Sequence, residues 1–330
     1  MRYGQVQGID KPVSRIVLGT MIINTREEAR SFAMIDAAFE QGGTTLDTAH
    51  VYAGGDSERA IGRWMKARGN RDQVVVLTKG AHPNADRPRV TPYDITSDLY
   101  DSLARLQTDF IDLYMLHRDD PSVPVGPIVD VLNDLRKAGK IRAFGGSNWT
   151  HTRLQEANAY AAARGLAPFT ASSPNFGLAE QVEDPWGPGC VTLSGPQNEA
   201  ARAWYRAQRM PVFAYSRLGR GFFSGRITRE NFPALKEILD GACVRAYCHE
   251  VNFRRLDRVE ALARQKGVPV PRIALAYALS QPLDVFALVG AASGAEYQEN
   301  LAALDLVLSG PELAWLDLRA EQAGGGASPA

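Results

Sequence analysis

The sequence predicts an α/β fold, a (β/α)8 barrel that forms one domain over residues 1–320. Short β-branched runs alternate with longer amphipathic runs along most of the 330-residue chain. Such alternation, without a change in composition, is typical of a single parallel sheet covered by helices. No G-x-G-x-x-G motif follows any predicted strand. This argues against an open dinucleotide-binding sheet and favours a closed barrel.

Seven strands are predicted from short, mostly apolar runs bounded by glycine, proline or charged residues, as expected for strands buried on both faces. They are Thr44–Ala49, Gln73–Lys79, Phe110–His117, Ile141–Asn148, Phe169–Ser173, Met210–Ser216 and Asp284–Gly290. The weakly patterned stretch before Asp284 has room for an eighth. Near the N-terminus, Gln5–Ile9 and Ser14–Leu18 flank a polar turn and predict a hairpin that plugs one end of the barrel.

Helices are predicted between these strands from apolar residues at helical spacing. They are Arg26–Gln41, Tyr93–Leu106, Val125–Ala138, His151–Ala163, Asn198–Arg209 and Val251–Gln265. Two segments break the alternation, Ala179–Pro196 and Arg217–Glu250. Both follow a strand, so we expect long loops on the C-terminal rim, where barrel enzymes build active sites. Residues 321–330 are expected to form a flexible tail.

Composition and charge exclude several classes of function. Lys and Arg number 37, as do Asp and Glu, so the chain lacks the basic character of nucleic-acid-binding proteins. No apolar stretch reaches the roughly 20 residues of a membrane span, and the N-terminus has no apolar run typical of a secretory signal. The three scattered cysteines match neither a disulfide framework nor a metal site. We therefore expect a cytoplasmic enzyme without a metal; its oligomeric state is left open.

Four polar residues lie at or just beyond the ends of three successive predicted strands. Asp47 lies at the exit of the first strand and Tyr52 about one turn later, Lys79 ends the second strand, and His117 ends the third. The exits of parallel barrel strands converge on one mouth, so these side chains should meet there. Each residue alone also fits a structural role, such as a turn cap for Asp47 or a core position for His117. Their occurrence on successive strand exits favours a catalytic site.

The chemistry of the four groups is coherent. A phenol has a pKa near 10, and a neighbouring ammonium stabilises the phenolate and lowers that pKa. A carboxylate paired with the lysine would fix the position of the ammonium, and an imidazole can orient a substrate oxygen. This predicts proton transfer by Tyr52, tuned by Lys79 and Asp47.

Six segments, in order, resemble the signature of the aldo-keto reductase superfamily. They are Leu46–Gly62, Val74–Gly80, Ile111–His117, Phe144–Asn148, Phe213–Gly225 and Gly290–Asn300. The resemblance runs from the N-terminal hairpin to about Leu308. It implies a barrel that binds an extended nicotinamide dinucleotide, with Asp47, Tyr52, Lys79 and His117 as the catalytic tetrad.

The resemblance also implies which residues hold the coenzyme. Ser147 and Asn148 match the pair that binds the nicotinamide carboxamide, and Ser173 stands where the family usually has glutamine. Tyr215 matches the aromatic residue on which the nicotinamide ring stacks, and Ser216, Leu218 and Gly219 match the loop along the pyrophosphate. The adenosine end is matched by Gly290, Ser293, Glu296, Glu299 and Asn300.

The Gly290–Asn300 motif departs from the pattern of relatives that prefer NADPH. Those relatives usually carry cations there, whereas this chain has Ala291, Ala292, Ser293 and then Glu296. A carboxylate suits a ribose 2′-hydroxyl better than a 2′-phosphate. NAD(H) is therefore favoured, with NADP(H) possible if Arg217 or Arg220 supplies a cation. Glu296 also fits a second role, since an acidic residue stabilises the start of a helix.

The predicted activity is hydride transfer between NAD(P)(H) and a carbonyl or alcohol, with a sugar or polyol as the expected substrate class. Two other interpretations remain. A cofactor-binding regulatory or scaffold subunit would keep the barrel and the coenzyme site with little turnover. A barrel hydrolase using Asp47 and His117 would leave Ser147–Asn148 and Gly290–Asn300 without a role.

Overall fold

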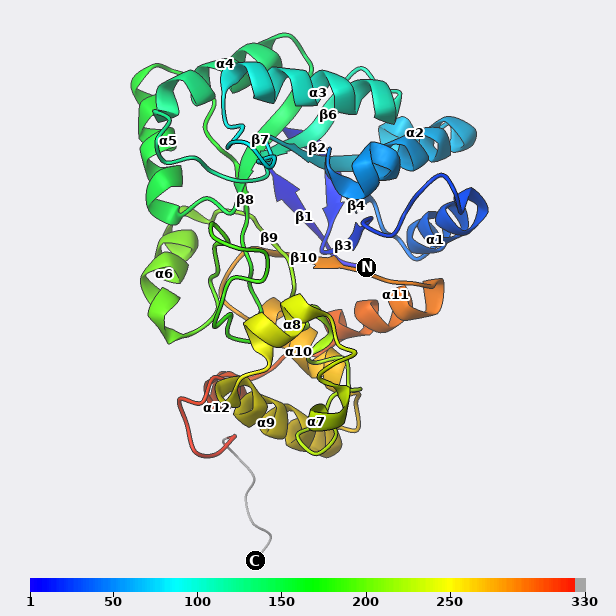
Figure 1. The fold of residues 1–330 in the computed structure, drawn as a ribbon, viewed down its shortest axis with the longest axis vertical. Helices are drawn as coiled ribbons and strands as arrows, with labels where there is room; N and C mark the ends of the chain where they lie inside the picture. The colour runs from blue at the N-terminus through cyan, green and yellow to red at the C-terminus, as the bar shows by residue number, and fades with distance from the viewer. Residues whose placement is uncertain (324–330) are drawn as a thin grey trace, which may run out of the picture.

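The computed structural model describes residues 1–323. Eight parallel strands close into a barrel in the order β10-β3-β4-β5-β6-β7-β8-β9, with helices around the outside (Figure 1). The strands are β3 (Ile16–Gly19), β4 (Thr45–Asp47), β5 (Val75–Gly80), β6 (Ile111–Leu116), β7 (Ile141–Ser147), β8 (Ala171–Ser173), β9 (Val212–Ala214) and β10 (Val285–Val289). The predicted (β/α)8 barrel is thus confirmed.

All seven predicted strands occur, each within or overlapping its predicted range. The predicted position of the eighth was wrong. The stretch before Asp284 forms helix α10 (Val270–Leu279), because its alanine and leucine residues favour a helix. The eighth strand is β3, which pairs with β4 on one side and β10 on the other.

The N-terminal hairpin exists, but its boundaries differ from the prediction. It pairs β1 (Tyr3–Val6) with β2 (Ile9–Ser14), and its turn contains Gly8 at φ +94°, a conformation that favours glycine. Val6, Ile9 and Val13 pack against residues inside the barrel such as Val75. Because Val75 begins its strand, the hairpin covers the N-terminal end of the barrel and leaves the opposite mouth for the site.

The outer layer contains every predicted helix, with ends that differ from the prediction by at most two residues, and several more. The helices are α1 (Glu28–Glu40), α2 (Asp56–Arg68), α3 (Pro92–Leu106), α4 (Val125–Lys137), α5 (His151–Ala163), α6 (Glu199–Gln208), α7 (Phe232–Leu235), α8 (Gly241–Tyr247), α9 (Glu250–Lys266), α10, α11 (Gly294–Leu301) and α12 (Gly310–Leu316). Helix α3 shows how they pack: Ile95, Leu99 and Leu106 are fully buried on one face, and Thr91 caps its first turn.

The two long segments differ from one another. Residues 179–196 contain no helix longer than a turn, whereas residues 217–250 contain α7 and α8, which lie in the lower half of the view in Figure 1. Phe222 and Phe223 anchor the second segment in a buried cluster with α8, α9 and α10. No helix within residues 1–323 is long and apolar enough to span a membrane. Of the expected tail, residues 324–330 lie outside the described part of the chain.

Candidate active site

The four predicted catalytic residues lie at the C-terminal ends of three adjacent strands. Asp47 is the last residue of β4, Lys79 is the last but one of β5, and His117 directly follows β6. Tyr52 begins the 3₁₀ turn η1 (Tyr52–Gly55), one loop beyond β4. The barrel therefore brings these side chains to one mouth.

The Lys79 ammonium joins the group together. Its nitrogen lies 2.6 Å from Asp47 Oδ1, 2.8 Å from the Thr48 carbonyl oxygen and 3.4 Å from the Tyr52 hydroxyl. Lys79 is 2% exposed and Asp47 is 3% exposed. An ammonium has three hydrogens to donate, so these three oxygens account for all of them.

The His117 imidazole lies beside the phenol of Tyr52. The two ring centroids are 5.9 Å apart, and the rings meet edge-on at 77°. His117 Nδ1 is buried and has no hydrogen-bond partner among residues 1–323. The Tyr52 ring is thus in contact with an imidazole, and its hydroxyl lies beside an ammonium.

Burial is the largest single influence on the pKa of each of these four side chains. It raises the pKa of Tyr52, and the nearby Lys79 ammonium offsets this only in part. The predicted net lowering of the Tyr52 pKa was therefore wrong in direction, because the cost of burying a phenolate exceeds the attraction to one ammonium. Burial opposes the charge on Lys79, but the Asp47 carboxylate holds the pKa of Lys79 above its usual value. Burial and the Lys79 charge hold the pKa of His117 well below its usual value.

The loop that carries Tyr52 has a constrained backbone. Ala53, Gly54 and Gly55 all have positive φ, and a Cβ on Gly55 would lie 2.5 Å from the Arg105 guanidinium. Next to this loop, buried Glu58 accepts a hydrogen bond from Thr78 at 2.6 Å and another from Arg105 at 3.2 Å. These contacts connect α2 and α3 to β5, one residue before Lys79.

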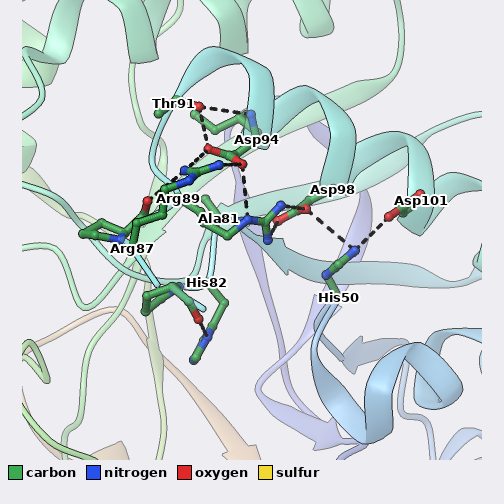
Figure 2. Close-up of polar contacts among 12 residues, drawn as sticks. His50, Ala81, His82, Arg87, Arg89, Thr91, Asp94, Asp98 and Asp101 are labelled. Carbon is green, nitrogen blue, oxygen red and sulfur yellow. Dashed lines mark hydrogen bonds and ion pairs between the residues drawn. The ribbon is translucent and has the colours of Figure 1, made fainter. Parts of the chain in front are cut away.

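His50, two residues before Tyr52, ties the same loop to α3. Its backbone N–H donates to the Lys79 carbonyl oxygen at 2.8 Å, and its ring Nε2 lies 3.1 Å from Asp101 Oδ2. Figure 2 shows this ring between Asp98 and Asp101. The Tyr52 loop is therefore held from both the strand and the helix layer.

The three residues predicted to bind the carboxamide, Ser147, Asn148 and Ser173, lie next to one another. Ser147 ends β7 and Ser173 ends β8, and the Ser147 hydroxyl donates to the Ser173 carbonyl oxygen at 3.0 Å. The Ser173 hydroxyl is buried without a partner among the described residues. Asn148 has φ +59°, and its amide oxygen accepts from the Tyr215 hydroxyl at 2.6 Å.

The residues predicted to follow the pyrophosphate lie on the loop after β9. Ser216 and Gly219 both have positive φ, and Leu218 immediately precedes the 3₁₀ turn η4 (Gly219–Gly221). Tyr215 lies 6.0 Å, centroid to centroid, from Trp186 of the 179–196 segment. This segment therefore reaches the predicted nicotinamide side of the mouth.

The predicted adenosine-binding motif follows β10, the strand next to β9. Gly290 directly follows β10, Ser293 caps α11, and Asn300 lies in the last turn of that helix. The Glu296 carboxylate accepts a hydrogen bond from the Ala292 backbone at 2.8 Å, and Glu299 pairs with Arg272 at 2.8 Å. Glu296 therefore has the helix-start role that the sequence allowed.

Arg217 and Arg220, on the loop after β9, both have other partners and are not free to supply a cation to the Gly290–Asn300 motif. Arg217 is 4% exposed and bonds the Ala214 carbonyl oxygen, and Arg220 pairs with Asp240 at 2.5 Å. Burial lowers the pKa of Arg217 to about 9, and the Asp47 charge offsets part of this effect. Arg217 lies three residues beyond the C-terminal end of β9, at the same end of the barrel as the Asp47–Lys79 pair.

Comparison with known proteins identifies the chain. Residues 15–318 match the profile described as "Aldo/keto reductase family". The chain belongs to the aldo/keto reductase family. It is 30% identical over 314 residues to the aldo-keto reductase YhdN of Bacillus subtilis, covering 88% of this chain and 85% of that protein. It is also 30% identical to norsolorinic acid reductase of Aspergillus flavus, covering 92% and 77%.

Solved structures agree with the family. An aldo/keto reductase from Klebsiella pneumoniae, in complex with NADP and acetate, superimposes with a TM-score of 0.67 at 28% identity, covering 93% of this chain and 91% of that one. A glycerol dehydrogenase from Gluconobacter oxydans has the same fold, with a TM-score of 0.75 at 24% identity and coverage of 96% and 94%. As an aldo/keto reductase, the protein is a nicotinamide-dependent oxidoreductase.

Sequence reasoning missed one residue of this aldo/keto reductase mouth. His82 follows β5 three positions after Lys79, and its ring lies 4.8 Å from that of His117, centroid to centroid. The signal was present in the sequence, since His82 lies just beyond the same strand exit that pointed to Lys79.

Proposed function

We propose that this aldo/keto reductase transfers a hydride between a nicotinamide coenzyme and a carbonyl or alcohol, with Tyr52 as the general acid and base. The observation that carries the proposal is the Lys79 ammonium, which touches the Asp47 carboxylate and the Tyr52 hydroxyl at the same time. A proton donor in the family's tetrad needs such a neighbour, because the phenolate formed after proton transfer is stabilised by the adjacent cation.

The residues at the mouth fit a nicotinamide dinucleotide. The buried Ser173 hydroxyl, which has no hydrogen-bond partner within residues 1–323, offers a hydrogen-bonding group at the carboxamide position, beside Ser147 and Asn148. Tyr215 would lie under the ring, Ser216, Leu218 and Gly219 along the pyrophosphate, and Gly290, Ser293, Glu296, Glu299 and Asn300 at the adenosine end. When bound, the coenzyme supplies or accepts the hydride.

The chain's own residues move the proton. In the reductive direction the neutral Tyr52 phenol donates its hydrogen to the carbonyl oxygen as that oxygen gains charge. The phenolate left behind faces Lys79, whose ammonium Asp47 holds in place. His117 is uncharged at neutral pH, so it orients the carbonyl oxygen through an imidazole N–H. The alcohol oxidation runs through the same groups in reverse.

We favour NAD(H) as the coenzyme. The support is that the Gly290–Asn300 motif carries no cation and that Arg217 and Arg220 are engaged elsewhere. A 2′-phosphate carries close to two negative charges at pH 7 and needs cations. Against this stand the NADP bound to the Klebsiella pneumoniae relative and the guanidinium of Arg272 beside Glu299. NADP(H) is the alternative that the kinetics must test.

The substrate class we favour is a sugar, sugar derivative or polyol. Support comes from the mixed polar and aromatic character of the mouth, where Trp186 is 46% exposed and lies near Tyr215. We also propose that residues 1–320 act as one domain. The three cysteines are free, which supports a reducing compartment, the cytoplasm, as its location.

A kinetic panel tests the proposal. NADH and NADPH are each offered with aldoses and simple carbonyls, and NAD⁺ and NADP⁺ with polyols and simple alcohols. The proposal expects turnover with NADH exceeding that with NADPH, and the opposite ratio would refute the coenzyme assignment. Coenzyme binding without turnover across the panel would instead favour a regulatory or scaffold role.

A further inference from the structure

The loop after β5 has an unusual backbone at the barrel mouth. Ala81 is fully buried and has φ +58°, the left-handed region that residues with a Cβ rarely adopt. Such strain persists only where the surroundings enforce it, and it is often found at functional sites. Ala81 directly precedes His82, so the strained residue sets the direction in which that imidazole leaves the strand.

Helix α3 enforces this backbone through Asp98. The Ala81 N–H donates to Asp98 Oδ2 at 2.8 Å, and Arg89 donates to both oxygens of the same carboxylate, at 3.0 and 2.6 Å (Figure 2). Asp98 is 1% exposed. A bidentate arginine–carboxylate pair is geometrically specific, so Asp98 holds the loop in one position.

The imidazole of His82 has a defined tautomer. Its Nδ1 lies 2.8 Å from the Pro83 carbonyl oxygen, which can only accept a hydrogen bond. Nδ1 therefore carries the hydrogen of the neutral ring, and Nε2 carries the lone pair. Burial, together with the Arg118 and Arg89 charges, lowers the pKa of His82, which keeps the ring neutral at pH 7. No group within residues 1–323 hydrogen-bonds to Nε2.

The ring of His82 meets that of His117 edge-on, at 76° and 4.8 Å between centroids. We propose that His82 determines substrate specificity by accepting, through Nε2, a hydrogen bond from a hydroxyl group on the carbon next to the reacting carbonyl. The inference rests on the proposed function, in which His117 orients the carbonyl oxygen. It assigns α-hydroxy aldehydes and ketones, and the vicinal diols formed from them, as the substrate class.

The polarity of the two imidazoles matches such a substrate. A carbonyl oxygen only accepts, so it needs the N–H of His117, whereas a hydroxyl group has a hydrogen to donate and needs an acceptor. Two rings in edge contact can reach oxygens on adjacent carbons. A carbonyl compound without the hydroxyl would leave His82 Nε2 unpaired, and sites built to bond a hydroxyl discriminate against analogues that lack it.

The first test compares paired substrates: glyceraldehyde with propionaldehyde, and hydroxyacetone with acetone. In His82→Phe the ratio of kcat/KM for the hydroxylated over the unsubstituted partner should fall by about tenfold, the size of one well-placed hydrogen bond. His82→Gln, which keeps an acceptor oxygen, should restore most of the ratio. His151→Phe, on α5, is the matched control and should leave the ratio as it is. An equal loss for both partners in His82→Phe would overturn the proposal.

A second test does not depend on turnover. Long-range ¹H–¹⁵N spectra of the wild-type protein should show His82 protonated at Nδ1 and bare at Nε2. With NAD⁺ or NADP⁺ present, propane-1,2-diol should shift the Nε2 resonance more than propan-1-ol does. Protonation at Nε2, or equal shifts from both alcohols, would overturn the role of His82. Failure of the proposed function has a different outcome, the absence of turnover for every carbonyl with either coenzyme.

Discussion

The Tyr52 hydroxyl lies 3.4 Å from the ammonium nitrogen of Lys79. Lys79 is in turn fixed by Asp47 and the Thr48 carbonyl oxygen, and all of these groups lie where β4 and β5 end. The relationship links the barrel to the chemistry, since two adjacent strands determine the separation between the phenol and the cation.

Removing the cation should destabilise the fold as well as stop turnover. Lys79→Met leaves the Asp47 carboxylate buried and unpaired, and breaking a buried pair in this way costs about 3–5 kcal/mol. Asp47→Asn combined with Lys79→Met removes both charges, so we expect the double variant to be more stable than Lys79→Met alone. Urea unfolding at pH 7 measures the free energy of unfolding of both variants. A double variant no more stable than Lys79→Met would contradict the buried pairing of Asp47 with Lys79.

The pH dependence of reduction follows from the directions of two pKa shifts. The Tyr52 pKa is raised, so the protonated, donating form persists at all pH values below it. Reduction should therefore stay level through neutral pH and decline only above about pH 10, the usual phenol pKa. The lowered pKa of His117 keeps that ring neutral, so no inflection should appear near its usual value of about 6.5. An inflection there that His117→Asn abolishes would contradict a neutral imidazole.

Asp94 of α3, which shares the Arg89 guanidinium with Asp98, should contribute stability in a defined pH range. Hydrogen bonds from Arg87, partly opposed by burial, lower the pKa of Asp94 to about 2. A lowered carboxyl pKa gives stability that is complete above the unfolded value and lost as the pH falls through the folded one. Asp94→Asn should therefore cost on the order of 2 kcal/mol at pH 7 and little near pH 2. Urea unfolding at both pH values checks this, and an equal cost at both would contradict it.

The assignment of the coenzyme can be tested at Glu296, where Glu296→Gln provides a matched control for Glu296→Arg. Glu296→Arg places a cation at the adenosine end and should move the ratio of kcat/KM for NADPH over NADH upward by about tenfold or more, since a charged hydrogen bond is worth about 1.5–3 kcal/mol. Glu296→Gln keeps an acceptor for the Ala292 N–H but removes the charge, which separates helix capping from electrostatics. An unchanged ratio in Glu296→Arg would remove Glu296 from coenzyme selection.

The sequence predicted the barrel and the residues at its mouth because both depend on local patterns. A buried strand reads as a short apolar run, and a polar residue directly after it must lie at the C-terminal rim, as with Lys79 and His117. It placed a strand at Ser14–Leu18, which overlaps β3, but assigned that strand to the hairpin, because a four-residue barrel strand beside a hairpin has the same local character as the hairpin itself. The sequence also could not predict the direction of the Tyr52 pKa shift, since burial is a property of the assembled barrel mouth.

Long-range contacts account for the rest of what was missed. Asp98 reaches Ala81 across 17 residues and thereby places His82, and the 179–196 segment reaches Asn148 through the Val191 N–H at 3.1 Å. No periodicity in the sequence encodes either contact. The roles of Ser147, Ser173 and Tyr215 toward the coenzyme stay predictions, supported by their positions at the C-terminal ends of the neighbouring strands β7, β8 and β9.

The most direct test of the account is the turnover of Tyr52→Phe with its best carbonyl and coenzyme. Removing the hydroxyl deletes the proton donor and leaves the ring against His117 and the neighbouring ion pair in place. A placed general acid contributes about 10²–10⁴-fold, so we expect kcat to fall by at least about 100-fold while coenzyme binding, followed by tryptophan fluorescence, changes little. A variant that retains near-normal kcat would contradict the assignment of Tyr52 as the proton donor.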